Sequence, residues 1–253
     1  MAKGETRQNA TARLLHRVAI DPTAAGKRLE RLPFLQKGPV ALTLSKPITI
    51  LAGENGCGKT TLIEAIAAKC GIRPDGGREY RETEDRRKST ALSKAVEVSF
   101  AGGRAFSGLF LRADKLDKQA KAATGENRVQ MPMTDEWRDA TEQSRGEAIL
   151  SLLAGTLESS ERRLFLLDEP EAALSPARQL VLLRLLDSIH QDGRSQVVLA
   201  SHSTILMAHP EADIFWIDED GIQRRDLDEI EHWRIMRRVV MDRDRFVAGL
   251  LED

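Results

Sequence analysis

The stretch that decides the fold is ITILAGENGCGKTTLIEAIAAKC, residues 48–70. Its first five residues form an apolar run, which is typical of a buried β-strand. Apolar residues then recur at spacings of three and four, at Leu62, Ile63 and Ile66, and predict a helix that ends at Gly71. The stretch therefore predicts a strand, a glycine-rich loop and a helix in direct succession.

The loop between the two elements carries a phosphate-binding pattern. Residues 53–60, GENGCGKT, match G-x-x-x-x-G-K-[ST] in full, and they lie between a strand and a helix, as this motif requires. Glycines let backbone N–H groups turn inward around phosphates, and the start of the helix adds positive potential. We expect Lys59 to reach the outer phosphates and the Thr60 hydroxyl to ligate Mg²⁺. The loop residues predicted to bind nucleotide are Gly53, Glu54, Asn55, Gly56, Cys57, Gly58, Lys59 and Thr60.

Cys57, within this loop, allows two interpretations. It occupies a variable position of the pattern, where any small side chain fits, and this is the simpler interpretation. The alternative is a redox-sensitive thiol, because Lys59 and the helix N-terminus nearby should lower the pKa of the thiol.

Two polar clusters follow other buried strands. LFLLDEP places Asp168 and Glu169 directly after an apolar strand. Beside a phosphate-binding loop, such an aspartate can hold Mg²⁺ and such a glutamate can position or deprotonate an attacking water; a structural pair of acids is the alternative. SQVVLASHS places His202 after a further strand. Because ligands bind at the carboxyl edge of an open α/β sheet, we expect His202 to contact the γ-phosphate.

The rest of the chain alternates strands and helices. Short strands are predicted at 40–44, 95–100 and 106–111, and an amphipathic C-terminal helix at 226–253. Ser175 and Pro176 are a good helix start. The apolar stripe that follows them, predicted to lie in the core, is Val181, Leu182, Leu185, Leu186 and Ile189. This order predicts one α/β domain with a mainly parallel sheet covered by helices on both sides.

Composition narrows the class of protein. With 39 acidic and 38 basic residues, no global field recruits nucleic acid or a membrane; the charge-dense segment 72–94 is interpreted as a solvated loop, with a nucleic-acid contact as the alternative. Two cysteines are too few for a disulfide framework, and no apolar run has the length of a signal peptide core or a membrane span. We therefore expect a cytoplasmic protein.

In combination, the motifs resemble those of ABC-type ATPase domains. GENGCGKTT, QSRGE at 143–147, LFLLDEP, EAALSP and ASHS resemble the Walker A, signature, Walker B, D-loop and switch-histidine motifs, in that order and at similar spacing. The resemblance covers about residues 38–220 and is strongest to stand-alone ABC-type ATPases labelled AAA-family ATPases, related to SMC-like and RecF-like repair ATPases. It implies a P-loop NTPase fold with a small antiparallel β part and a short helical subdomain at 113–157.

The resemblance also implies a role for each matched residue. Lys59, Thr60 and Thr61 would hold the phosphates of ATP and Mg²⁺, Asp168 would support the metal, Glu169 would be the catalytic carboxylate and His202 would contact the γ-phosphate. Ser144 and Gly146 belong to the signature-like segment, which in the family faces the nucleotide of the other subunit. The implied active form is thus a homodimer that encloses two ATP molecules.

Several positions depart from the family pattern. Arg145 replaces the first signature glycine, and Ser175 stands where the D-loop usually has aspartate. Arg112, Ala113 and Asp114 stand at the Q-loop position, which has no glutamine; Asp114 is either an oxygen near the metal or a helix N-cap. The one weak candidate for stacking adenine is Phe34, for which packing is the alternative role.

Three functions are compatible with these motifs. The expected one is a Mg²⁺-dependent soluble ATPase whose dimer opens and closes on a protein or nucleic-acid partner. The alternative is the ATP-binding subunit of a membrane transporter, but 32 positions (144 minus 112) separate Arg112 from Ser144, which is short for a subdomain that receives a permease, and the Q-loop glutamine is missing. A small-molecule kinase is the least favoured, because the acid pair, the signature and His202 suit hydrolysis.

Overall fold

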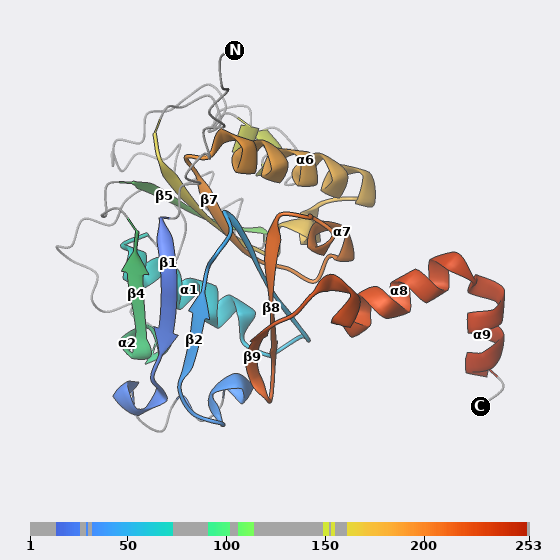
Figure 1. Cartoon of the computed structure of the whole chain (residues 1–253), viewed down its shortest axis with the longest axis horizontal. Coiled ribbons are helices and arrows are strands. Elements are labelled where there is room, and N and C mark those ends of the chain that lie inside the picture. Colours follow the sequence, from blue (N-terminus) through green and yellow to red (C-terminus); the bar gives the residue numbers. More distant parts are fainter. Residues whose placement is uncertain are drawn as a thin grey trace, which may run out of the picture.

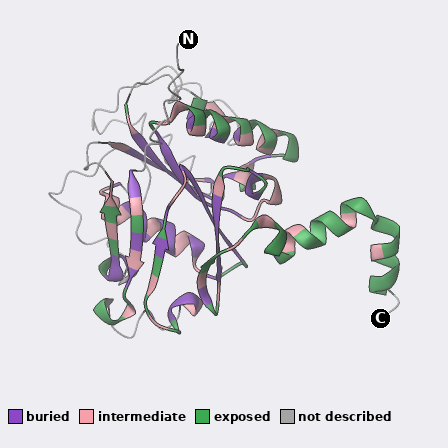
Figure 2. Ribbon diagram, viewed as in Figure 1, coloured by how far each residue is buried: buried purple, intermediate pink, exposed green. Residues whose placement is uncertain are grey.

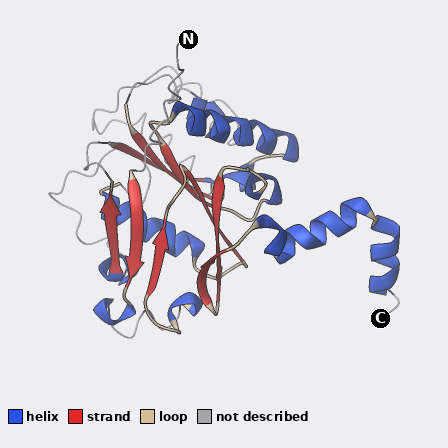
Figure 3. Ribbon diagram, in the orientation of Figure 1, coloured by secondary structure: helices blue, strands red, loops and turns tan. Residues whose placement is uncertain are grey.

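The computed structural model describes residues 14–25, 29, 32–72, 91–101, 106–113, 149–151, 153–154 and 161–251. Its centre is a six-stranded sheet with the order β5-β6-β7-β3-β8-β9. The strands are β3 (Ile48–Gly53), β5 (Ser107–Arg112), β6 (Arg163–Asp168), β7 (Gln196–Ala200), β8 (Ala212–Asp218) and β9 (Gly221–Arg224). All neighbours pair in parallel except β8 and β9, which form a hairpin. The predicted mainly parallel sheet is confirmed (Figures 1 and 3).

The position of β3 within this sheet explains why an apolar run begins the phosphate loop. Every residue of β3 is buried, and β7 and β8 pair with it on its two sides. Strands β6 and β7 are buried along their whole length as well. Because the five parallel strands point the same way, the residues that follow β3, β6 and β7 meet at one carboxyl edge.

A second, three-stranded antiparallel sheet has the order β2-β1-β4. It consists of β1 (Leu15–Ile20), β2 (Val40–Thr43) and β4 (Val96–Phe100). The sequence predicts β2 and β4 but misses β1, because the register of β1 shifts between Leu15 and Arg17 and interrupts the period-two pattern. The buried side chain of Gln196 accepts hydrogen bonds from the backbone of Leu14 and Leu15 and so joins this sheet to β7.

Helices cover both faces of the central sheet (Figures 1 and 2). Helix α1 (Lys59–Cys70) lies on the face turned toward the antiparallel sheet, and α6 (Pro176–Asp192) and α7 (Thr204–Met207) lie on the opposite face. Ser175 caps α6 as predicted. On the inner face of α6, Leu182, Leu186 and Ile189 are fully buried. Val181 is 46% exposed, so the buried face of α6 is narrower than the predicted apolar stripe. The short elements are η1 (Pro22–Ala25), η3 (Pro33–Leu35), α2 (Ala91–Ala95), η6 (Pro170–Ala173) and η7 (Leu227–Glu229).

The C-terminal segment forms two helices, where the sequence predicts one. Helix α8 (Glu231–Met241) is followed by α9 (Arg243–Leu251), and Asp242 between them has a non-helical backbone, with φ −151° and ψ 61°. Buried Ile230 anchors the start of α8, whereas the rest of α8 and all of α9 extend away from the central sheet (Figure 1). Within the described part of the chain, no helix combines the length and the apolar character needed to cross a membrane.

Candidate nucleotide site

The phosphate loop keeps its shape because two of its glycines have no room for a side chain. Gly53 has φ +150°, and a Cβ there would lie 2.3 Å from the carbonyl oxygen of Ile217 on β8. Gly58 has φ +105°, and a Cβ there would lie 2.7 Å from the ring of Phe34. Phe34 is itself fully buried, so the structure supports a packing role for this ring. Neighbouring elements thus fix the loop at both ends.

Lys59, the first residue of α1, is held inside the loop. Its side chain is almost entirely buried, and Nζ donates hydrogen bonds to the carbonyl oxygens of Gly53 (3.0 Å) and Glu54 (2.9 Å). From this position a lysine ammonium group can reach the outer phosphates of a nucleotide. The backbone around Gly53 and Glu54 therefore sets where the positive charge lies.

Cys57 is buried in the same loop, with Sγ 3.8 Å from Nζ of Lys59. Burial raises the pKa of the Cys57 thiol and outweighs the neighbouring Lys59 charge, which acts in the opposite direction. A raised pKa lowers the fraction of reactive thiolate. The structure thus favours the simpler interpretation, a small residue that fits the loop, over a redox-sensitive thiol.

The acid that ends β6 lies against the start of α1. The hydroxyl of Thr60 donates a hydrogen bond to Oδ1 of Asp168 over 3.0 Å, although 108 residues separate them in the chain. Burial raises the pKa of Asp168 to about 6, while the hydrogen bond from Thr60 and the charge of Arg112 lower it. A hydroxyl and a carboxylate side by side are oxygen ligands of the kind that Mg²⁺ uses together with substrate phosphates. These two residues fit the predicted metal role.

Arg112, for which the sequence assigned no role, belongs to this cluster. It ends β5, forms an ion pair with Glu64 of α1, and has Nε 3.5 Å from Oδ2 of Asp168. Its guanidinium is largely buried, at 12% side-chain exposure. The sequence contains one indication of this role: Arg112 ends the apolar strand FSGLFLR, and the end of that strand lies at the same edge of the sheet as the acids. Asp114, two residues further on, lies outside the described residues.

Glu169 adopts an unusual backbone conformation. It has φ 48° and ψ 52°, and it alone among the described non-glycine residues has a positive φ. Such a conformation costs about 1–3 kcal/mol and is found mainly where a side chain must be aimed. The backbone N–H of Glu169 donates to the carbonyl oxygen of Ala200 on β7 over 2.9 Å, which holds the residue in place.

Glu169 and His202 meet across the ends of β6 and β7. Oε1 of Glu169 lies 3.3 Å from Nε2 of His202, and the glutamate side chain is 41% exposed, so water reaches it. Burial and the charge of Lys59 lower the pKa of His202, which favours a neutral imidazole. Glu171 accepts hydrogen bonds from the Ser201 hydroxyl (2.8 Å) and the backbone N–H of His202 (2.5 Å), and these orient the loop.

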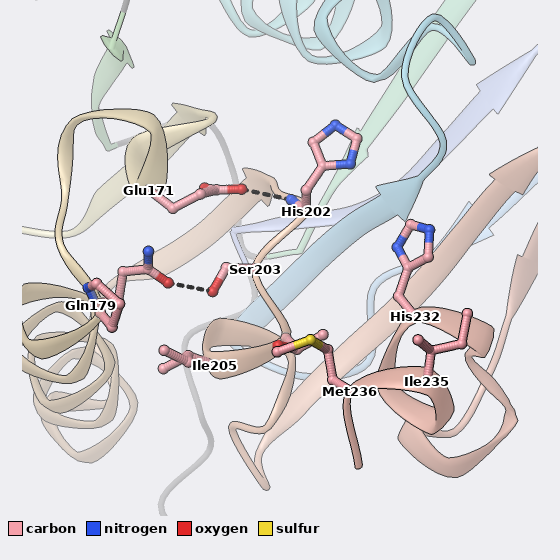
Figure 4. A pocket seen from close by; sticks show the side chains of 10 residues that line it. Glu171, Gln179, His202, Ser203, Ile205, His232, Ile235 and Met236 are labelled. Atoms are coloured by element: carbon pink, nitrogen blue, oxygen red, sulfur yellow. Dashed lines mark hydrogen bonds between the residues drawn. The ribbon is translucent and has the colours of Figure 1, made fainter. Parts of the chain in front are cut away.

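A pocket of about 550 Å³ opens beside His202 (Figure 4). His202 and Ser203 line it from the loop after β7, Gln179 from α6, and His232 and Met236 from α8. The Ser203 hydroxyl donates to Oε1 of Gln179 over 2.7 Å, which joins α6 to the histidine loop.

The structure thus brings together the predicted phosphate-loop residues with Asp168, Glu169 and His202. The predicted signature residues Ser144 and Gly146, and Arg145 between them, lie outside the described residues. Their roles, and that of Thr61 in holding phosphate, stay predictions.

Comparisons with known proteins find ATP-binding proteins among the relatives of this chain. The family model described as "AAA domain, putative AbiEii toxin, Type IV TA system" matches residues 132–208. The thiamine import ATP-binding protein ThiQ of Chelativorans sp. (strain BNC1) is 28% identical over 190 residues, covering 69% of this chain and 76% of that protein. The molybdenum import ATP-binding protein ModC of Rhizobium etli is 27% identical over 197 residues, covering 72% of this chain. The chain spans only 55% of the length of that protein.

Among solved structures, cbiO1 from Clostridium perfringens, part of the ABC transporter complex cbiONQ, is similar at a TM-score of 0.48 and 17% identity, covering 94% of this chain and all of that one. The phosphate loop with Lys59, the acidic end of β6, the histidine after β7 and the similarity to these ATP-binding proteins are consistent with an ABC-type ATPase.

Proposed function

We propose that the site at the carboxyl edge of the central sheet binds ATP with Mg²⁺, and that Glu169 and His202 carry out hydrolysis there. The observation that carries this proposal is the contact between Glu169 and His202, 3.3 Å apart, beside the loop that holds Lys59. The participating groups come from three loops that follow β3, β6 and β7. Only the fold brings them together.

The proposed mechanism assigns each group a task. The exposed carboxylate of Glu169 accepts a hydrogen bond from the attacking water and orients it toward the γ-phosphorus. The neutral imidazole of His202 donates its N–H to a γ-phosphate oxygen. Lys59 and the loop N–H groups stabilise the negative charge that develops during transfer. Thr60 and Asp168 would hold Mg²⁺, which would supply positive charge beside the phosphate oxygens.

A second copy of the chain completes the proposed site. Glu169 and the pocket beside His202 are open to solvent, so the nucleotide face can meet another surface. Ser144 and Gly146 of the second copy are the proposed groups that contact the γ-phosphate from the far side. This arrangement makes hydrolysis dependent on an ATP-bound homodimer.

The curated relatives favour the transporter alternative over the stand-alone ATPase that the sequence predicts. ThiQ and ModC are both named as ATP-binding proteins of import systems. We therefore propose a membrane permease as the partner that hydrolysis drives. The stand-alone ATPase remains the second candidate because the Q-loop position, which begins with Arg112 and its contacts to Glu64 and Asp168, has no glutamine.

Replacing Glu169 by glutamine tests the mechanism. Glu169→Gln keeps the shape of the side chain but loses the basic oxygen, so we expect ATP binding to persist while kcat falls by about 10²- to 10⁴-fold. Glu211→Gln is the matched control, because Glu211 lies outside the site and pairs with Lys46. Hydrolysis at the wild-type rate by Glu169→Gln would rule out the proposed role of this carboxylate.

The same variant distinguishes the two partners. Glu169→Gln with Mg-ATP should be retained by membranes that contain its permease, and size-exclusion chromatography should give a dimer. If the ATP-loaded dimer instead co-purifies with soluble protein or nucleic acid and never with a permease, the second candidate is correct. A monomer both with and without Mg-ATP would contradict the homodimer.

A further inference from the structure

His232, the second residue of α8, touches the phosphate loop directly. Its Nε2 lies 2.6 Å from Oε1 of Glu54, although 178 residues separate the two in the chain. An ionised carboxylate can only accept, so the imidazole N–H donates this hydrogen bond. Within the described residues, this is the one hydrogen bond between a side chain of α8 and the loop at 53–58.

Residues of the hydrophobic core hold the His232 ring in place. Its edge packs against Trp216, with ring centroids 5.2 Å apart and planes at 79°. Trp216 lies on β8 and pairs with Ala52, the residue before the phosphate loop begins. Fully buried Ile230 fixes the chain two residues before His232. The imidazole that contacts the loop is therefore positioned by Trp216 and Ile230, which belong to the hydrophobic core.

Glu54 connects this contact to the nucleotide. Its carbonyl oxygen accepts one of the two hydrogen bonds that hold the Lys59 ammonium group, over 2.9 Å. The side chain of Glu54 is 72% exposed and, among the described residues, has His232 as its side-chain hydrogen-bond partner. A restraint on the side chain of Glu54 therefore limits the movement of the backbone that positions Lys59.

We propose that His232 is a positioning residue for the ATPase: through Glu54 it holds the phosphate loop in its binding conformation and couples α8 to nucleotide binding. The inference rests on the proposed function, because it concerns the same site. A restrained loop loses less conformational freedom when phosphate binds, so the hydrogen bond strengthens ATP binding and leaves the chemical step unaffected.

The coupling gives α8 a means to influence the site. Beyond its first turn, α8 carries exposed apolar side chains, including Val240 at 74% and Met241 at 77% exposure. Any contact that moves α8 would strain or release the bond between His232 and Glu54. Nucleotide affinity should therefore depend on where α8 lies.

The test measures ATP affinity and turnover separately. In the full-length chain, His232→Ala should raise the Kd and KM for Mg-ATP by about two- to five-fold, the effect of losing one partly exposed hydrogen bond, with kcat unchanged. His232→Gln, whose amide nitrogen can replace the ring N–H, should restore most of the affinity. Kd is measured with a fluorescent ATP analogue in the Glu169→Gln background, so that the readout does not depend on hydrolysis.

A double-mutant cycle tests whether His232 affects ATP affinity through Glu54. The variant Glu54→Ala with His232→Ala should bind no more weakly than either single variant, because both remove one interaction. Arg237 lies on α8 like His232 but pairs with Asp228 of η7, so Arg237→Ala is the matched control and should leave Kd unchanged. Additive losses of affinity, or a wild-type Kd for His232→Ala, would overturn the inference. If the wild-type chain itself binds no ATP, the proposed function fails instead.

Discussion

Replacing Asp168 by asparagine should make the protein more stable while it destroys Mg²⁺-dependent activity. Asparagine has the shape of the protonated carboxyl group and keeps an oxygen for the Thr60 hydroxyl. In the folded chain burial raises the pKa of Asp168 from 3.8 to about 6, even with Thr60 and Arg112 favouring the charged form. At about 1.4 kcal/mol for each pKa unit, holding the charge in the folded state costs about 3 kcal/mol above pH 6.

The pH dependence follows from the direction of this change. Between pH 3.8 and about 6 the folded state binds more protons at Asp168 than the unfolded state does. The free energy of unfolding of the wild type therefore falls as the pH rises through this window. Above the window, the whole cost of burying the ionised Asp168 lowers the stability of the folded state. Asparagine does not titrate, so the advantage of Asp168→Asn should be about 3 kcal/mol at pH 8 and should shrink steadily as the pH falls from 6 toward 4.

Urea denaturation followed by circular dichroism, without nucleotide or Mg²⁺, measures this difference. The matched control is Asp213→Asn, because Asp213 is equally buried but accepts hydrogen bonds from Ser45 and Lys46 and pairs with Arg224. Loss of these charged contacts should destabilise the control by about 1–3 kcal/mol. An Asp168→Asn protein that is less stable than the wild type at pH 8, or an advantage that stays constant down to pH 5, would refute the electrostatic reasoning.

Two further predictions concern the phosphate loop. Lys59→Ala should weaken ATP binding itself by at least about tenfold, since a charge-assisted contact contributes about 1.5–3 kcal/mol, and an unchanged Kd in calorimetry would contradict the role of Lys59. Cys57 should react with iodoacetamide at pH 7 more slowly than a free thiol, because burial raises its pKa; rapid ATP-protected alkylation, followed by mass spectrometry, would instead support the redox interpretation.

Much of the central fold follows from the sequence because its strands are buried on both sides. Such strands are continuous apolar runs, and glycine or polar residues mark where they end, as in β3, β6 and β7. The half-exposed β1 escapes prediction because its bulge breaks the alternation. Val181 shows a second limit: a helical stripe predicts which face is turned inward, but the width of the buried band depends on how closely α6 packs on the sheet.

The candidate site was predictable where one motif or one strand end defines it, and unpredictable where the fold joins distant segments. Lys59, Asp168, Glu169 and His202 could be named because each follows a buried strand. Arg112 and His232 could not, since their importance lies in contacts with residues that are 48 and 178 positions away. No local pattern contains such a pairing, and only the order of strands in the sheet determines it.

Arg112 and His232, which the sequence analysis did not identify, both contact acidic residues of the site. At the carboxyl edge, burial raises the pKa of Asp168, and the nearby charges of Glu169 and Glu64 raise it further. Arg112 lies between Glu64 and Asp168 and offsets part of this repulsion, whereas His232 pairs with Glu54 at the opposite side of the loop. Arg112, at the segment where the family has a glutamine, thus has a physical reason in this chain: its charge offsets that of Asp168, the acid proposed to hold Mg²⁺. A glutamine there would leave Asp168 with a still higher pKa, and Arg112→Gln should narrow the pH range in which the ionised Asp168 is available for Mg²⁺.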